Sequence, residues 1–113
     1  MQVSISLPKE FSLHSVEQRV LTLRQSIRPL LERYQDEFLT DISHISTAAV
    51  FDGGMQLEGV EHLKDNLYRL DYSYLWSIAW TCSGVQEGGR VKEKVRFSVE
   101  DDGMLSFKFL RFD

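Results

Sequence analysis

Aromatic side chains with polar tips recur at every second position of one stretch, and they are the residues best suited to bind a small molecule. The alternate positions from 68 to 82 are Tyr68, Leu70, Tyr72, Tyr74, Trp76, Ile78, Trp80 and Cys82. A period of two predicts a β-strand, which places these side chains on one face of a sheet. Aromatic rings supply apolar contact area, and their O–H and N–H groups orient a ligand. Tyr72, Trp76 and Trp80 are therefore candidate contacts for an apolar or aromatic ligand; the alternative is that this face is a filled core.

Glu93 and Arg111 form a second candidate site, which depends on the register of the last two strands. Residues 90–100 and 105–109 both alternate, and the turn between them decides which residues face each other. A two-residue turn would oppose apolar and polar side chains, whereas the three-residue turn Asp101-Asp102-Gly103, with its glycine left-handed, pairs apolar with apolar. The expected pairs are Val99 with Leu105, Phe97 with Phe107, and Val95 with Phe109. The same register sets Glu93 against Arg111, either as a polar contact for a ligand or as a structural ion pair.

Four cations occupy the other side of the strand 90–100, namely Arg90, Lys92, Lys94 and Arg96. Such a row could meet nucleic-acid phosphates, but the chain has a formal net charge of −4 and a pI of about 5.3. A solvated outer face is therefore favoured, and no nucleic-acid partner is expected. Leu75, Leu110 and Phe112 share this outer face with serines. A mixture of this kind suits the surface of a homodimer.

Metal and thiol chemistry are not predicted. His14, His44 and His62 lie far apart in the sequence and belong to no metal-spaced pair, so we expect them on the surface. Cys82 is the single cysteine, and no histidine stands near it to lower its pKa. It is expected to be a buried, inert thiol. No metal and no cofactor is therefore expected.

The composition predicts one soluble domain. The chain has 113 residues, of which 42% are hydrophobic and 27% charged, and a chain of this length buries roughly two-thirds of its unfolded surface. No apolar run approaches the roughly 20 residues that a bilayer requires, and the N-terminus lacks the pattern of a signal peptide. We expect a cytoplasmic protein without a membrane partner. Residues 1–113 form a single domain, with 1–12 as a strand or extended arm and 13–113 as a helix-on-sheet core.

A long helix is expected to cover the aromatic strand. Ser12 or Ser15 can cap it, the second with Gln18 as a capping box. Apolar residues follow at helical spacing: Val16, Val20, Leu23, Ile27, Leu30 or Leu31, Tyr34 and Phe38. Pro29 lies inside this pattern and predicts a kink or a break near residues 26–29. Residues 39–45 are expected to add a further helical turn.

Residues 47–67 are predicted to form a hairpin and then a short helix. Residues 47–51 and 55–58 have strand character around the turn Asp52-Gly53-Gly54. Gly59 precedes Val60, Leu63 and Leu67, whose spacing is helical. Residues 83–89 predict a loop. The order of elements predicts an α+β fold, in which a long kinked N-terminal helix packs on a curved antiparallel sheet.

The stretch VFDGGMQLEGVEHLKDNL, in this order of elements, resembles the nuclear transport factor 2-like superfamily, whose cone-shaped α+β fold includes ketosteroid isomerases and polyketide cyclases. The matching positions are Phe51-Asp52-Gly53, Leu57, Gly59, Leu63 and Leu67, together with the final hairpin VRFSVEDDGMLSFKFLRFD. The resemblance covers about residues 15–113. It implies a domain that binds or processes a small molecule inside a cone.

In the ketosteroid isomerase branch, a tyrosine late in the first helix and a protonated aspartate form an oxyanion hole, while another aspartate moves the proton. The resemblance implies that Tyr34 takes the place of that tyrosine and Asp52 the place of the base. Val95 stands where the protonated acid is expected, and Glu93 is the nearest acid. The alternative is a packed core tyrosine and an ordinary turn aspartate. The alternative function is a non-enzymatic, dimeric interaction module that uses the outer sheet face.

Overall fold

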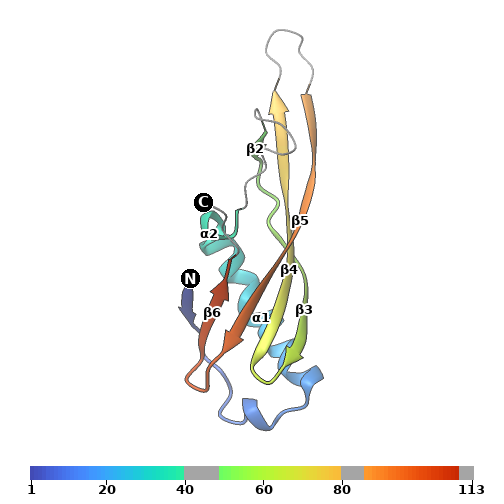
Figure 1. The fold of residues 1–113 in the computed structure, drawn as a ribbon. Helices are drawn as coiled ribbons and strands as arrows, with labels where there is room; N and C mark the ends of the chain where they lie inside the picture. The colour runs from blue at the N-terminus through green and yellow to red at the C-terminus, as the bar shows by residue number, and fades with distance from the viewer. Residues whose placement is uncertain (40–48, 80–85, 110–113) are drawn as a thin grey trace.

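The protein is an α+β structure in which one long helix packs on a curled antiparallel sheet (Figure 1). The computed structural model describes residues 1–39, 49–79 and 86–109. The molecule is elongated, with extents of 58 × 28 × 21 Å. Its length comes from the hairpin of the two longest strands, which continues well beyond the helix (Figure 1). The helix-on-sheet prediction is therefore confirmed at the level of fold class.

The helix α1 runs from Val16 to Arg33 and begins as its sequence predicts. The backbone N–H of Gln18 donates to Oγ of Ser15 at 3.2 Å, so Ser15 is the N-cap. Its buried residues are Leu23, Ile27, Leu30 and Leu31. The helix continues through Pro29, so the predicted break is wrong, while the kink stays a prediction. The buried leucines directly after Pro29 hold the last turn against the sheet, and their burial outweighs the one lost backbone bond.

Two short helical segments flank α1. The 3₁₀ helix η1 spans Phe11–Leu13, and α2 spans Gln35–Phe38. The further helical turn predicted for residues 39–45 falls, apart from residue 39, outside the described residues. Phe38 is fully buried and makes edge-to-face contacts with Tyr72, Phe107 and Phe109. The short α2 therefore closes one end of the core.

Within the described residues the sheet has six strands, all paired in antiparallel fashion. They are β1 (Gln2–Ser4), β2 (Val50–Phe51), β3 (Gln56–Lys64), β4 (Leu67–Ala79), β5 (Gln86–Val99) and β6 (Met104–Lys108). Their order is β1-β6-β5-β4-β2, and β3 also pairs with β4. The predicted N-terminal strand or arm is thus a strand, with Val3 opposite Leu105.

Two predictions for residues 47–67 are wrong. Val50 and Phe51 pair with Ser77 and Trp76 of β4, not with β3, so no β2–β3 hairpin forms in the described part of the chain. Residues 59–64, expected to be helical, belong to β3, which pairs with β4 from Gln56 to Lys64. The edge of β4 carries a row of backbone N–H and C=O groups, and a strand satisfies them where a helix could not. Residues 47 and 48 lie outside the described residues.

The last two strands have the register expected from a three-residue turn. Val99 pairs with Leu105 and Phe97 with Phe107, and the φ of Gly103 is 89°. A Cβ at Gly103 would overlap the carbonyl oxygen of Ile5, so both the backbone conformation and the lack of space require glycine. The ladder ends at Arg96 opposite Lys108, and the pairing of Val95 with Phe109 stays a prediction. Residues 86–89, expected in a loop, are part of β5, and residues 83–85 lie outside the described residues.

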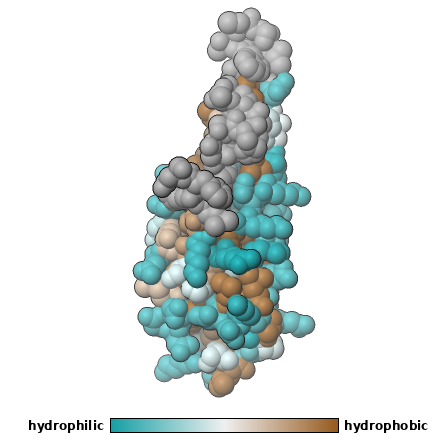
Figure 2. Space-filling model, in the orientation of Figure 1, coloured by the Kyte–Doolittle hydropathy of each residue, from teal (hydrophilic) through white to brown (hydrophobic). Residues whose placement is uncertain are grey.

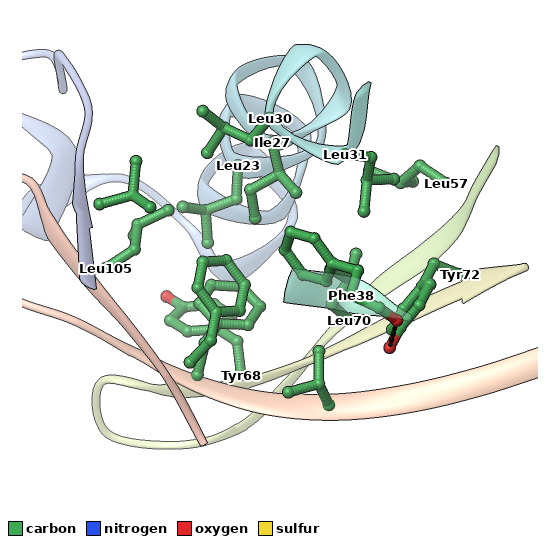
Figure 3. Packing of buried hydrophobic residues seen from close by; sticks show 14 of the residues in the cluster. Leu23, Ile27, Leu30, Leu31, Phe38, Leu57, Tyr68, Leu70, Tyr72 and Leu105 are labelled. Atoms are coloured by element: carbon green, nitrogen blue, oxygen red, sulfur yellow. Dashed lines mark hydrogen bonds between the residues drawn. The ribbon is translucent and has the colours of Figure 1, made fainter. Parts of the chain in front are cut away.

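The aromatic face of β4 lies inside the core where the helix covers it (Figure 3). Tyr68, Leu70, Tyr72 and Tyr74 are each at most 1% exposed. They pack with the leucines of α1 and with Phe97 and Phe107. In this part of the sheet the aromatic side chains fill the space beneath the helix.

Candidate functional site

A groove of about 500 Å³ lies along the far part of the β4–β5 hairpin. Three elements form it: the residue after β2, the second half of β4 and the first half of β5. The lining residues are Asp52, Leu75, Trp76, Ser77, Ile78, Glu87, Gly88 and Gly89. The groove thus combines an indole, two carboxylates and small residues.

Two glycines of β5 make room for this groove. Gly89 lies directly opposite Trp76, and Gly88 lies opposite Ser77. A Cβ at Gly89 would lie 3.0 Å from Nε1 of Trp76, and a Cβ at Gly88 would lie 3.0 Å from the carbonyl oxygen of Trp76. Glycine in a strand often marks such a close approach. Gly88 and Gly89, which suggested a loop in the sequence, therefore lie in a strand and leave room for the indole of Trp76.

Asp52 reaches the groove because its turn is fastened to β4. The Asp52 N–H donates to the carbonyl of Leu75 at 2.8 Å, and the Leu75 N–H donates to the carbonyl of Gly53 at 2.8 Å. Gly53 and Gly54 have φ values of 79° and 66°, which glycine adopts at no steric cost. Residues 52–54 thus form a bend between two strands that both pair with β4, and not the hairpin turn that was predicted. It leaves Asp52 exposed at the rim.

A polar network fixes the same turn from the outer face of the sheet. Nη1 of Arg90 donates to the carbonyl of Gly54 at 2.9 Å and to Oγ of Ser73 at 2.8 Å. Oγ of Ser73 in turn donates to Oε1 of Glu58. Ser73 is fully buried, so these bonds satisfy a polar group that would otherwise be costly. Arg90, predicted as one cation of a solvated row, also has this structural role.

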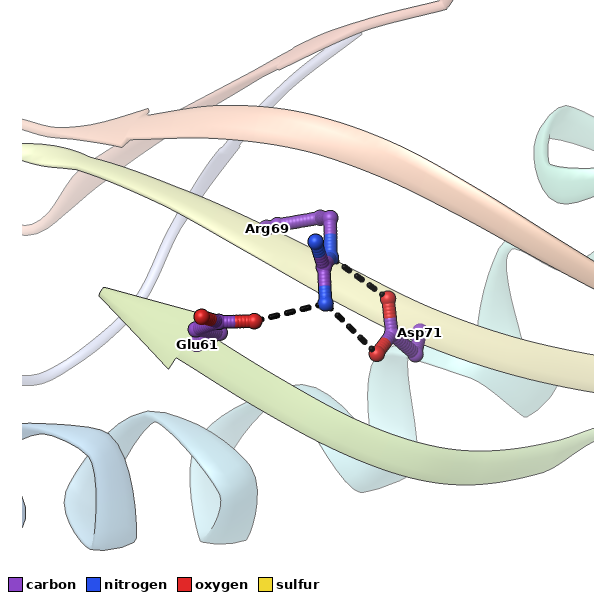
Figure 4. Close-up of polar contacts among 3 residues, drawn as sticks. All are labelled: Glu61, Arg69 and Asp71. Carbon is purple, nitrogen blue, oxygen red and sulfur yellow. Dashed lines mark hydrogen bonds and ion pairs between the residues drawn. The ribbon is translucent and has the colours of Figure 1, made fainter. Parts of the chain in front are cut away.

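A second group of charges lies on the outer face near the other end of the sheet (Figure 4). Arg69 pairs with Glu61 at 2.6 Å and with Asp71 at 2.9 Å. Lys92, Lys94 and Arg96 of the neighbouring strand are exposed. The outer face thus presents both signs of charge, and the sequence pattern had shown only the cations.

The structure brings two of the predicted site residues together and separates the others. Asp52 and Trp76 both line the groove. Tyr34 is the C-cap of α1, half-buried against the core. Glu93 is half-buried and lies opposite Tyr72. Trp80 and Arg111 fall outside the described residues, as do Cys82, His44, Leu110 and Phe112.

Tyr72 belongs to the packed core. Its hydroxyl donates to the carbonyl oxygen of Phe38 at 2.7 Å, and the side chain is 1% exposed. Burial raises the pKa of the Tyr72 phenol well above its ordinary value, and the charge of Glu93 adds to this effect. The Tyr72 phenol is therefore neutral and hydrogen-bonded, and its role is structural.

A smaller pocket of about 280 Å³ lies at the opposite end of the sheet. Its lining includes Arg19, Tyr68 and the two turns that follow β3 and β5. Sequence reasoning did not predict it, because its residues come from four separate segments. One sequence feature could have pointed to it, because Tyr68 is the first polar-tipped aromatic residue of the alternating set on β4.

The described residues hold no group of three or more histidine, cysteine, aspartate or glutamate side chains that could bind a metal ion. No helix in the described ranges is both long enough and apolar enough to cross a membrane. Comparisons with protein-family models, with curated proteins and with solved structures give no match. The structure itself therefore defines the class of the protein: an α+β fold in which an 18-residue helix packs on a curled antiparallel sheet.

Proposed function

We propose that this protein binds a small apolar or aromatic molecule in the groove that Asp52 and Trp76 line. The observation that carries the proposal is that one groove contains two residues chosen from the sequence alone. Its volume of about 500 Å³ falls within the roughly 300–1,000 Å³ typical of ligand sites. Asp52 and Glu87 add negative charge to its lining. A ligand with an aromatic part and a protonated amine matches these groups.

The nuclear transport factor 2-like cone is the architecture that we propose for this fold. It is supported by a long helix that precedes a curled antiparallel sheet and by the final hairpin with its glycine turn. The strand β3, in place of the short helix of that family, counts against it. A solved relative with the same strand order would decide the matter.

Catalysis by Asp52 and Tyr34 together would require both side chains to contact the same bound molecule. Neither of the two described pockets is lined by both residues. Binding is accordingly the function that we propose, and the catalytic role of the pair is a further hypothesis within it. A reaction that stops in both Asp52→Asn and Tyr34→Phe would support that hypothesis.

The binding proposal can be tested by NMR on the whole chain. A set of small aromatic amines is titrated while the indole N–H signal of Trp76 is followed, which a Trp76→Phe variant assigns. We expect a saturable shift, and Asp52→Asn should weaken binding about tenfold because a charge-assisted hydrogen bond is lost. Asp36→Asn, in the exposed first turn of α2, is the matched control. An indole signal that no amine moves, or equal binding by Asp52→Asn, would refute the proposal.

An interaction module is the second candidate, and the charges of the outer face favour it. Exposed Lys92 and Lys94 of β5 lie beside β4, which carries Asp71. A second copy turned by a two-fold axis could set these cations against the acids of its partner. Figure 2 shows hydrophilic residues over much of the described surface in view, with hydrophobic patches between them. Because Lys92 and Lys94 would lie in the contact, such a homodimer would be salt-sensitive. Sedimentation at low and high salt would test it, and a monomer under both conditions would exclude it.

A further inference from the structure

The pocket at the end opposite the groove is built where two turns and the start of the helix meet. The turns after β3 and β5 lie at the same end of the molecule as η1 (Figure 1). Asn66 connects the two turns through two hydrogen bonds. Its Nδ2 donates to the backbone carbonyl of Val99 at 3.2 Å, and the Val99 N–H donates to the backbone carbonyl of Asn66 at 2.9 Å. Phe11 and Val99 contribute apolar lining to the pocket. Two hydrogen bonds thus hold neighbouring segments of the pocket wall together.

The second feature of this region is the buried hydroxyl of Tyr68. Tyr68 is 1% exposed, and its hydroxyl has no hydrogen-bond partner among the residues that the structure describes. The ring is held between His62, at a centroid distance of 5.0 Å, and Phe97, at 5.7 Å (the ring is labelled in Figure 3). An unpaired buried hydroxyl is costly, which makes it informative.

Arg19 of α1 presents a second unsatisfied donor to the same pocket. Its Nε is buried and also lacks a hydrogen-bond partner within the described part of the chain. Burial raises the pKa of the Tyr68 phenol, and the nearby charge of Arg19 opposes that rise. An O–H group and a guanidinium group thus lie close together, and neither the phenolic proton nor the Nε–H has an acceptor among the described residues. A carboxylate supplies oxygens for both.

The rim of the pocket has the opposite charge. Asp65, Glu100 and Asp101 line the pocket and are exposed. A simple anion would be attracted by Arg19 but repelled by these three carboxylates. A molecule that carries a carboxylate at one end and an ammonium group at the other satisfies both regions. The pocket volume of about 280 Å³ leaves room for a short apolar part as well.

We propose that this pocket binds a small zwitterion with an apolar part, of the chemical class of apolar α-amino acids. The carboxylate accepts hydrogen bonds from the Tyr68 hydroxyl and from Nε of Arg19. The ammonium group faces Asp65, Glu100 and Asp101, and the apolar part packs against Phe11 and Val99. This site is separate from the groove, and the two proposals stand or fall independently.

Calorimetric titration of the whole chain with leucine tests the proposal. Leucinamide removes the carboxylate and N-acetylleucine removes the ammonium charge, so we expect each to bind at least tenfold more weakly than leucine. Tyr68→Phe, which deletes one oxygen atom, should lower leucine affinity about tenfold. Tyr72→Phe deletes a hydroxyl of the same strand face outside the pocket and should leave leucine affinity unchanged.

Three results would overturn the proposal. If none of the probes binds, the Tyr68 hydroxyl is satisfied by water alone. If leucinamide binds as tightly as leucine, the carboxylate has no role, and if Tyr68→Phe binds leucine as well as the wild type, the hydroxyl is not a ligand group. Asp52→Asn separates the two sites, because it should weaken amine binding in the groove and leave leucine binding intact.

Discussion

The two ends of the β4–β5 hairpin share one alternating sequence pattern but differ in the elements that surround them. From Leu67 to Ser73, β4 has β5 on one side and the nine-residue β3 on the other. Beyond Leu75 its second neighbour is β2, which has two residues. Tyr68 and Tyr72 are core residues at the first end, while Trp76 lines a groove at the second. The sequence pattern therefore decides on which face of the sheet a side chain lies. The surrounding elements decide whether that face becomes core or lines a groove.

Tyr68 and Tyr72 make the same comparison within the covered end. Both are 1% exposed and both point to the helix side of β4. The Tyr72 hydroxyl has a backbone acceptor from α2, whereas the Tyr68 hydroxyl has no acceptor among the described residues. Equal burial thus hides a difference in hydrogen bonding, and that difference separates a structural tyrosine from a candidate binding residue.

The largest expected effect is the loss of Phe38. Phe38→Ala should lower the free energy of unfolding by about 3–5 kcal/mol, because it removes a fully buried ring from the covered end. Trp76→Ala, at the partly exposed end, should cost clearly less. Urea unfolding of the two variants measures both values. Equal losses would show that the two ends are packed alike.

Gly103→Ala should have the next largest effect. Its positive φ and the clash of a Cβ with the Ile5 carbonyl should together cost about 3 kcal/mol. Gly53→Ala is the matched control, since its φ is also positive but a Cβ there meets no atom within 4 Å. We expect the control to lose only about 1–2 kcal/mol. Melting temperatures that fall equally would contradict the role of the Ile5 contact.

Removal of the tyrosine hydroxyls should have opposite results at the two positions. Tyr72→Phe leaves the Phe38 carbonyl without its donor and should cost about 1–2 kcal/mol. Tyr68→Phe removes an unsatisfied group and should leave the stability unchanged or slightly increased. Chemical denaturation without added ligand distinguishes the two. A similar loss in both variants would mean that the Tyr68 hydroxyl has a partner after all.

The smallest expected change in stability is that of Gly89→Ala. The new methyl group would lie 3.0 Å from Nε1 of Trp76, and the partly exposed indole can shift, so the cost should be no more than about 1 kcal/mol. Binding in the groove should nevertheless weaken, and the indole N–H signal of Trp76 should move. Gly59→Ala, where the nearest atom is 3.9 Å away, is the control and should leave that signal unchanged.

Local chemistry was enough to predict several elements. Short-range rules gave Ser15 as one of two candidate caps, the alternation of β4, and the register of Val99 and Phe97 with the last strand. The helix predicted from residue 59 and the loop predicted at Gly88-Gly89 were wrong, since residues 59–64 and 88–89 lie in strands whose state depends on a distant neighbour. β3 is a strand because the edge of β4 is available to it, and the glycines of β5 accommodate an indole from the opposite strand.

For the candidate sites, the sequence by itself determined which side chains share a face and which turns require glycine. It singled out Asp52 and Trp76, and the tertiary structure brought them into one groove by pairing β2 with β4. Only the tertiary structure decided that Tyr72 is core and that Tyr68 meets Arg19 in a second pocket. The physical reason is that periodicity is a property of neighbours in the chain, whereas burial, hydrogen-bond satisfaction and cavities depend on residues far apart in it.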